Sequence, residues 1–197
     1  MSKAGKVMRN VRKVMEKIDH GNRIITNIPA GMAAAGPPLG PMLGQHGINI
    51  AAFCKDFNER TKDIKEGIPL PTRVTVNPDR SYTIVIHKPP TTYYLKQAAG
   101  IQRGAMEPGN EVAGKITLKH LYEIAQIKSE DPPLALLDLE AICKKFVGIA
   151  HSVGIEIVSK DMDPKEYQEF LTERAATVEQ QKKSLQEAKE AKMLRTG

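Results

Sequence analysis

Histidine and cysteine are the residues of this chain best suited to nucleophilic, acid-base or metal chemistry. The five histidines are His20, His46, His87, His120 and His151. None of them is paired with another histidine or a cysteine at the spacing of metal ligands. The chain also has no GxSxG motif and no glycine-rich loop followed by Lys-Ser or Lys-Thr. We therefore expect no catalytic residue, no metal site and no cofactor, and we expect that the protein is not an enzyme.

The two cysteines, Cys54 and Cys143, each fall on the apolar stripe of an expected helix. This placement indicates reduced thiols that contribute to a core in a reducing compartment.

A segment rich in glycine and proline, GMAAAGPPLGPMLGQHG at Gly31–Gly47, is the most unusual stretch of the sequence. It contains five glycines, three prolines and no charged residue. These residues disfavour a helix interior and a central strand, so we expect a long loop with extended polyproline geometry at Gly36–Pro38. Such a loop is more often functional than passive, although a plain surface linker stays an alternative. The PxxP pattern at Pro38–Pro41 also fits ligands of aromatic-groove domains.

The positive charge of the chain is concentrated at its N-terminus. Residues 1–23 carry seven Lys or Arg against two acidic residues, which is most of the net charge of +6. This basic arm has an amphipathic helical pattern, typical both of a mitochondrial transit peptide and of an arm that lies on RNA or an anionic surface. The rest of the chain is nearly neutral, so charge alone does not predict nucleic-acid binding. No apolar run reaches the length of a membrane span.

The elements before residue 88 predict a compact α+β domain. Residues 23–28 alternate like a strand, and the Gly/Pro segment follows. Asn49 is a good N-cap for an amphipathic helix over about 50–62. Strands near 73–76 and 81–86 flank a turn at Asn77–Arg80 and form a hairpin.

Two prolines after Lys88 predict a domain boundary, because they prevent continued strand pairing. Beyond them we expect a helix over 91–99, an open loop over 100–114, a helix capped by Thr117 and a helix from Asp138 to Gly154. A short strand over 155–158 completes this three-helix domain. From residue 163 the sequence is rich in Glu, Lys, Gln and Ala, which favours a solvated single helix over a coiled coil.

The expected organisation is thus a basic arm (1–19), an N-terminal α+β domain (20–88), a C-terminal helical domain (89–158) and a charged helical extension (159–197). Several motifs in these expected domains resemble those of one known family. GPPLGPMLGQHGINIAAFCKDFNERT, PLPTRVTVNPDRSYT, KPP, AGKIT, LYEIAQIK and GIAHSVGI occur in the order found in large-subunit ribosomal protein eleven. The similarity covers about residues 22–158 and fits the bacterial and mitochondrial branch. The arm and the extension favour a mitochondrial ribosome, and hence a protein of the mitochondrion.

The resemblance implies a structural ribosomal protein of two small domains, the first α/β-sandwich-like with a hairpin and the second a three-helix RNA-binding domain with short strands. It implies that the C-terminal domain binds the GTPase-associated region of large-subunit rRNA. The N-terminal domain would face translational GTPases and ribosomal proteins at the stalk base. Five residues of its Gly/Pro segment would line the face for factors and thiopeptide antibiotics: Pro37, Pro38, Gly40, Pro41 and Gly44. A membrane and a small-molecule substrate are not implied.

A nearly neutral domain can bind RNA if small side chains and backbone N–H groups approach phosphates and 2′-hydroxyls. On this basis, and on the resemblance, we expect the following RNA-binding residues: Lys96, Arg103, Gly114, Lys115, Thr117, Lys119, Lys128, Gly148, His151, Ser152 and Gly154. Capping and helix packing are the alternative explanation of the glycines. The family usually has Arg at the position of His151, and Glu107 and Glu111 stand in a loop that is often more basic. The rival function is an adaptor that presents Pro38–Pro41 to a protein groove.

Overall fold

The computed structural model describes residues 23–196 except 78 and 80, and the side chains as far as residue 193. The predicted arm at 1–19, His20 and part of the turn at Asn77–Arg80 lie outside these residues. The chain divides into two compact units between Pro89 and Pro90. Each unit has a hydrophobic core of its own, and the two are described separately below.

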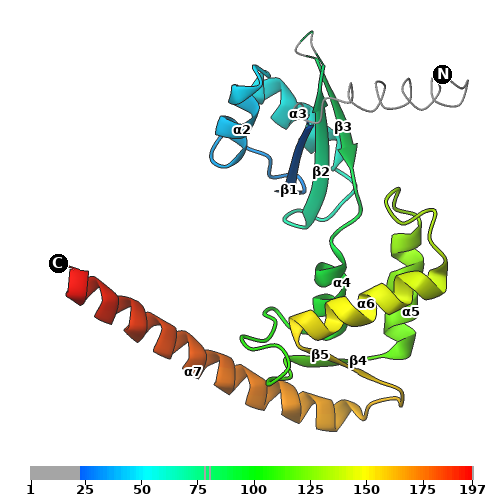
Figure 1. Ribbon diagram of the computed structural model, residues 1–197, viewed down its shortest axis with the longest axis vertical. Helices are drawn as coiled ribbons and strands as arrows, with labels where there is room; N and C mark the ends of the chain where they lie inside the picture. Colours follow the sequence, from blue (N-terminus) through cyan, green and yellow to red (C-terminus); the bar gives the residue numbers. More distant parts are fainter. Residues whose placement is uncertain (1–22, 78, 80, 197) are drawn as a thin grey trace, which may run out of the picture. The chain divides into compact units, whose positions relative to one another are not determined.

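The first unit is built on a three-stranded antiparallel sheet (Figure 1). Strands β1 (Arg23–Pro29), β2 (Pro69–Val76) and β3 (Tyr82–Ile86) lie in the order β1-β2-β3. Ile28 pairs with Leu70, and Val74 pairs with Ile84, so these buried side chains share one face of the sheet. Ile25 and Val85 point to the exposed face. The predicted strand at 23–28 and the predicted hairpin are confirmed.

One helix covers the buried face of this sheet. Helix α3 (Ile50–Arg60) begins after Asn49, whose side chain accepts a hydrogen bond from the N–H of Ala52 at 3.3 Å, as expected of an N-cap. Phe53 and Phe57 are fully buried one helical turn apart, and the ring of Phe53 contacts that of Tyr82 edge-on. Cys54 lies in the same core, and burial raises the pKa of its thiol.

The Gly/Pro segment is not the continuous loop that its composition predicts. It contains a short helix, α2 (Leu39–Gln45), and Pro38 before it has helical angles (φ −91°, ψ −7°) instead of extended ones. Proline is tolerated in the first turn of a helix, where its missing N–H has no partner to lose. Leu39 and Leu43, one turn apart, are buried in the core and hold the helix against the unit.

The second unit packs three helices against a small parallel sheet (Figure 1). Its helices are α4 (Thr91–Ala98), α5 (Leu118–Ser129) and α6 (Leu139–Val153). Strands β4 (Gly114–Thr117) and β5 (Ile155–Val158) pair in parallel, with Ile116 opposite Ile157. Leu95, Ile116, Ile142 and Phe146 are almost fully buried at the centre. The predicted helices and the strand β5 are confirmed. Strand β4 was not located from the sequence, since its partner lies 41 residues further along the chain.

The ends of these helices follow the predicted capping residues. The hydroxyl of Thr117 accepts a hydrogen bond from the N–H of His120, and the ring of His120 bonds back to the N–H of Thr117. Gly100 and Gly154 follow α4 and α6 with positive φ, and Gly154 has a left-handed φ of 79°. Cys143 lies on the inner side of α6, against the core.

The extension is one long helix, α7 (Pro164–Thr196). It is a single helix as predicted, but it is not solvated along its whole length. One face of its first half packs on the second unit and includes Tyr167, Phe170, Arg174 and Val178. From Lys182 to Met193 every residue is exposed. Among the described residues, no helix combines the length and apolarity needed to cross a membrane.

Candidate RNA-binding surface

The C-terminal half of α6 presents a face with little side-chain bulk. Gly148, His151 and Ser152 are exposed there, while Phe146 and Ala150 are buried on the opposite face of the helix. A Cβ atom added at Gly148 would meet no described atom within 4 Å. The Ser152 hydroxyl donates to the carbonyl of Ile149 at 2.7 Å, which leaves its lone pairs able to accept a further bond. The surface over Gly148 is therefore open to close approach by a partner's backbone.

A groove runs beside this face, between α6, β5 and the loop before β4. Its lining includes Val147 and His151 from α6, Val112 from the loop and Gly154 at the end of the helix. The carboxylate-bearing residues Glu111 and Glu156 also line it. The groove thus combines apolar lining with a histidine and two acidic residues, and His151 is the predicted contact residue on α6 that lines it.

Two of the predicted cationic residues are available for a phosphate. Lys96 lies in the last turn of α4 and Arg103 in the loop that follows, and both side chains are partly exposed. Within the part of the chain that the structure describes, neither forms an ion pair. These two residues can supply positive charge without first breaking an internal contact.

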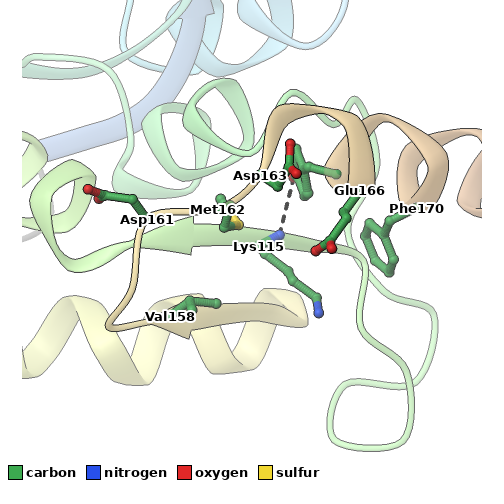
Figure 2. A pocket seen from close by; sticks show the side chains of 8 residues that line it. Lys115, Val158, Asp161, Met162, Asp163, Glu166 and Phe170 are labelled. Carbon is green, nitrogen blue, oxygen red and sulfur yellow. Dashed lines mark hydrogen bonds between the residues drawn. The ribbon is translucent and has the colours of Figure 1, made fainter.

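Lys115 and Lys119 are instead engaged by residues of β5, of α7 and of the segment between them. The ammonium of Lys115 lies 3.4 Å from a carboxylate oxygen of Glu156. It also lies 5.4 Å from the ring centroid of Phe170, and Figure 2 shows Lys115 and Phe170 in the lining of one pocket. The ammonium of Lys119 lies 2.8 Å from Asp161. Lys119 is well exposed, so its ion pair contributes little stability and can exchange Asp161 for a phosphate.

Lys128 does not lie on the RNA-facing surface that the sequence predicts. Its side chain is only 8% exposed, and its ammonium is hydrogen-bonded to the carboxylate of Asp131. A phosphate could reach it only if this buried pair opened, which leaves a charge without its partner in a medium of low dielectric constant. The expectation that Lys128 contacts RNA is therefore corrected, and the structure gives it a role inside the domain.

Gly114, Thr117 and Gly154 also have structural duties that explain their residue types. A Cβ atom at Gly114 would lie 3.0 Å from the Cβ of Ala99. At Gly154 it would lie 2.3 Å from the Cβ of Ala105, in addition to the positive φ. Thr117 is buried and its hydroxyl caps α5. Capping and packing, the alternative explanation of the glycines, account for Gly114 and Gly154 but not for Gly148, and capping also accounts for Thr117.

A polar network that joins α7 to the loop before β4 was missed by sequence reasoning. The Glu111 carboxylate accepts hydrogen bonds from Arg174 and Gln181 of α7 and from the N–H of Met106 at 2.8 Å. Arg174, aided by these other donors, holds the pKa of Glu111 at about 2, below its ordinary value. The hydroxyl of Tyr167 donates to the carbonyl of Ala99 at 2.6 Å and accepts from the N–H of Lys115 at 3.2 Å. The seven-residue spacing of Leu171, Val178 and Leu185 was the available sequence signal for a packed face.

In the first unit, α2 exposes the residues predicted to face factors. Pro37, Pro38, Pro41 and Gly44 are exposed, and Gly40 is partly exposed. A Cβ atom at Gly40 would lie 2.6 Å from the carbonyl oxygen of Ala35, so this glycine permits the close turn into the helix. Since Pro38 and Pro41 lie at the start of a helix, they do not present the extended polyproline conformation that aromatic grooves recognise.

The start of the Gly/Pro segment is fixed to α3 by hydrogen bonds. The amide of Asn58 bonds both the N–H and the carbonyl of Ala33, at 3.0 and 3.2 Å. The hydroxyl of Thr61 accepts from the N–H of Gly31 at 3.1 Å. These bonds, together with the buried leucines of α2, give the exposed prolines a defined position on the first unit.

Two family models match these two units in turn. The model described as "Ribosomal protein L11, N-terminal domain" matches residues 24–82, and the model described as "Ribosomal protein L11, RNA binding domain" matches residues 87–157. The chain belongs to the ribosomal protein L11 family. The α7 helix lies beyond the part that the L11 models match, and the exposed face of α6 lies within the RNA-binding domain.

Similar L11 proteins occur in animals and bacteria. The "Large ribosomal subunit protein uL11m" of Drosophila melanogaster is 61% identical over 197 residues, which is all of both chains. The protein of the same name from Caenorhabditis elegans is 51% identical over 94% of both chains. The "Large ribosomal subunit protein uL11" of Hydrogenobaculum sp. is 47% identical over 66% of this chain and 88% of its own length. The two animal proteins therefore extend over nearly the whole chain, including most of the region beyond the L11 domains.

Membership in the L11 family settles several of the expectations. L11 proteins are structural components of the large ribosomal subunit and bind rRNA, so this chain is a ribosomal protein and not an enzyme. The predicted mitochondrial location is confirmed by the relatives named uL11m. Among the described residues, no three His, Cys, Asp or Glu side chains are grouped so that they could hold a metal ion.

Proposed function

We propose that this protein binds the GTPase-associated region of large-subunit rRNA at the stalk base and supports translational GTPases there. The C-terminal domain (89–158) binds the rRNA, and the N-terminal domain (20–88) faces elongation factors and neighbouring stalk-base proteins. The observation that carries the proposal is the exposed face of α6. On this face Gly148 leaves open space, and the polar side chains of His151 and Ser152 are exposed to solvent.

Recognition by shape suits this surface better than recognition by charge. Several cationic residues of the domain are engaged internally, Lys128 by a buried pair and Lys115 by Glu156 and Phe170. A folded RNA can instead be bound through close backbone approach at Gly148 and hydrogen bonds to phosphates and 2′-hydroxyls from Ser152 and His151. Lys96 and Arg103 then add a small number of phosphate contacts.

The factor-facing role is assigned to the short helix α2 and its exposed prolines. Pro37, Pro38 and Pro41 form an uncharged, pre-positioned surface, because the buried leucines of α2 fix it to the core. Little conformational entropy is lost when a partner binds a rigid surface of this kind. The same residues, with Gly40 and Gly44, form the proposed face for thiopeptide antibiotics.

The rRNA proposal is tested by placing a side chain where the RNA backbone is expected. Gly148→Val adds atoms to open space, so the free energy of unfolding should change by less than about 1 kcal/mol. Its affinity for a fragment of the GTPase-associated rRNA should fall by about tenfold or more, as expected for an overlap that costs ~1.4 kcal/mol or more. Fluorescence anisotropy of the labelled fragment measures the affinity, and urea unfolding measures the stability.

Gly44→Val is the matched control for this experiment. Gly44 is also an exposed helical glycine with no described atom within 4 Å of an added Cβ, but it lies in the first unit. Its variant should bind the rRNA fragment like the wild type. Equal affinity of the Gly148 variant and the wild type would contradict the proposed contact face, and a wild type that does not bind the fragment would contradict the proposed function.

A further inference from the structure

A pocket lies between the first half of α7 and the loop that follows α4. Its charged lining consists of Arg103 from the loop and of Arg174, Glu179 and Lys182 from α7. Its apolar lining includes Ile101 and Leu171. Arg174 is already paired with Glu111, so Arg103 and Lys182 against Glu179 leave one excess positive charge around a concave surface, and such a surface attracts an anion.

We propose that α7 completes a pocket that binds a phosphate of the rRNA backbone, with Arg103 and Lys182 as its two contacting cations. This inference rests on the proposed rRNA-binding function and assigns to the extension a part in it. Neither cation has an ion-pair partner among the described residues, so binding a phosphate costs no internal contact. The alkyl stems of both residues can lie along the apolar lining while the charged ends meet the phosphate.

Arg174 adds a second and independent reason to place an anion here. Only 8% of its side chain is exposed. One of its terminal nitrogens, Nη1, donates a hydrogen bond to the Glu111 carboxylate. Its Nε and Nη2 atoms have no hydrogen-bond partner in the described part of the chain. Both atoms are buried beneath the pocket surface, so an anion in the pocket would stabilise the Arg174 guanidinium through its charge and not through a hydrogen bond to these atoms.

The pocket depends on the docking of α7, since two of its three cations belong to that helix. Docking is fixed by the hydroxyl of Tyr167, which bonds the carbonyl of Ala99 and the N–H of Lys115. It is also fixed by Glu111, which joins the loop to Arg174 and Gln181. The family model of the RNA-binding domain ends at residue 157, so the pocket adds a contact that the domain alone lacks.

The occupant is argued to be RNA because the loop side of the pocket belongs to the RNA-binding domain. Arg103 lies within residues 87–157, and the loop begins directly after α4, whose last turn carries Lys96. A phosphate in the pocket would therefore contact a cation of the RNA-binding domain itself. An acidic peptide offers carboxylates of similar charge, and it is distinguished by the experiment below.

The test compares two neighbouring lysines of α7. Lys182 lines the pocket, whereas Lys183 is equally exposed and does not line it. Lys182→Gln and Arg103→Gln should each weaken binding of the full chain to the GTPase-associated rRNA fragment by about 3–10-fold. Each should also reduce the slope of log affinity against log salt concentration by about 1, as for one lost phosphate contact. The affinity of Lys183→Gln should stay within about twofold of the wild type.

The double variant of Lys182→Gln and Arg103→Gln should lose less affinity than the product of the two single losses, because both cations share one phosphate.

Several outcomes would overturn the pocket. Equal affinity of Lys182→Gln and the wild type would do so while leaving the rRNA-binding function intact, and equal losses at Lys182 and Lys183 would indicate a diffuse basic helix instead. Unchanged RNA binding with loss of affinity for a polyglutamate peptide in the Lys182 variant would assign the surface to an acidic protein. Failure of the wild type to bind the fragment would contradict both the pocket and the proposed function.

Discussion

Glu111 shows how one side chain can connect an extension to a domain. Its carboxylate accepts from Arg174 and Gln181 of α7 and from two backbone N–H groups of its own loop, those of Met106 and Glu107. The sequence placed Glu111 in a loop that is often more basic in the family. The structure shows that the carboxylate is used within the protein, where it orders the loop before β4 and holds α7.

The lowered pKa of Glu111 predicts how this connection depends on pH. Because the pKa is about 2 in the folded protein and near 4.3 in the unfolded chain, the stabilisation is fully present above about pH 5 and is lost as pH falls toward 2. Glu111→Gln should lower the free energy of unfolding by about 1–3 kcal/mol at neutral pH, as for a lost hydrogen bond to a charged group. The difference from wild type should shrink below about pH 4.5. Urea unfolding at a series of pH values measures it.

Glu107→Gln serves as the control for this series. Glu107 is an exposed residue of the same loop, so its variant should stay within about 0.5 kcal/mol of the wild type at every pH. A Glu111 effect that is the same at pH 7 and at low pH would show that the lost contact is not the ionised one.

At the scale of elements, α2 is held in the core by two leucines, and its two glycines differ in the space that a side chain would have. An added Cβ at Gly40 would lie 2.6 Å from the carbonyl oxygen of Ala35, whereas at Gly44 it would meet no described atom within 4 Å. Gly40→Ala should therefore destabilise the first unit by about 1–3 kcal/mol, as overpacking against backbone does. Gly44→Ala should stabilise it by up to about 1 kcal/mol, because alanine loses less backbone entropy in a helix. Urea unfolding of the full chain measures both changes.

Equal effects of the two alanine substitutions would contradict this account of α2. Stabilisation by Gly40→Ala in particular would mean that the segment Ala35–Gly40 adopts another turn in solution. The comparison also tests whether the Gly/Pro segment is helical at all, since a disordered loop would tolerate alanine at either position within about 0.5 kcal/mol.

For the whole molecule, the two separate cores permit a division of labour between the units. Phe53 and Phe57 centre one core, and Ile142 and Phe146 centre the other. Pro41 is exposed in the first turn of α2, and alanine is also tolerated there, so Pro41→Ala should leave folding intact. It should leave rRNA affinity unchanged and lower factor-dependent GTP hydrolysis on assembled ribosomes by about fivefold, as for ~1 kcal/mol lost at an interface.

Val85→Thr is a suitable comparison, because Val85 is exposed on the open face of the sheet in the same unit. Val85→Thr should change neither the rRNA affinity nor the rate of factor-dependent GTP hydrolysis. A loss of rRNA affinity in the Pro41 variant would contradict the proposed separation of roles, and unchanged GTP hydrolysis would remove Pro41 from the factor-facing surface.

The sequence by itself determined the features that depend on local chemistry. Asn49, Thr117 and Gly154 mark the helix ends they were expected to mark, because capping requires only a side chain or a positive φ within one turn. Alternation predicted β1, and the turn at Asn77–Arg80 predicted the hairpin, although β2 begins at Pro69, before the expected strand near 73–76. The ordered motifs also predicted the family, which the two matching domain models confirm.

Tertiary structure alone decided which residues are exposed and which are buried. Lys128 has the same side chain as Lys96, yet it is buried with Asp131, since the fold brings that part of α5 inside. The α2 helix forms in a proline-rich segment because Leu39 and Leu43 find a core to enter. Likewise, Glu111 and Arg174 are sixty-three residues apart, and no local pattern predicts that they meet. Long-range packing determines these contacts, because burial and pairing depend on neighbours that sequence spacing does not specify.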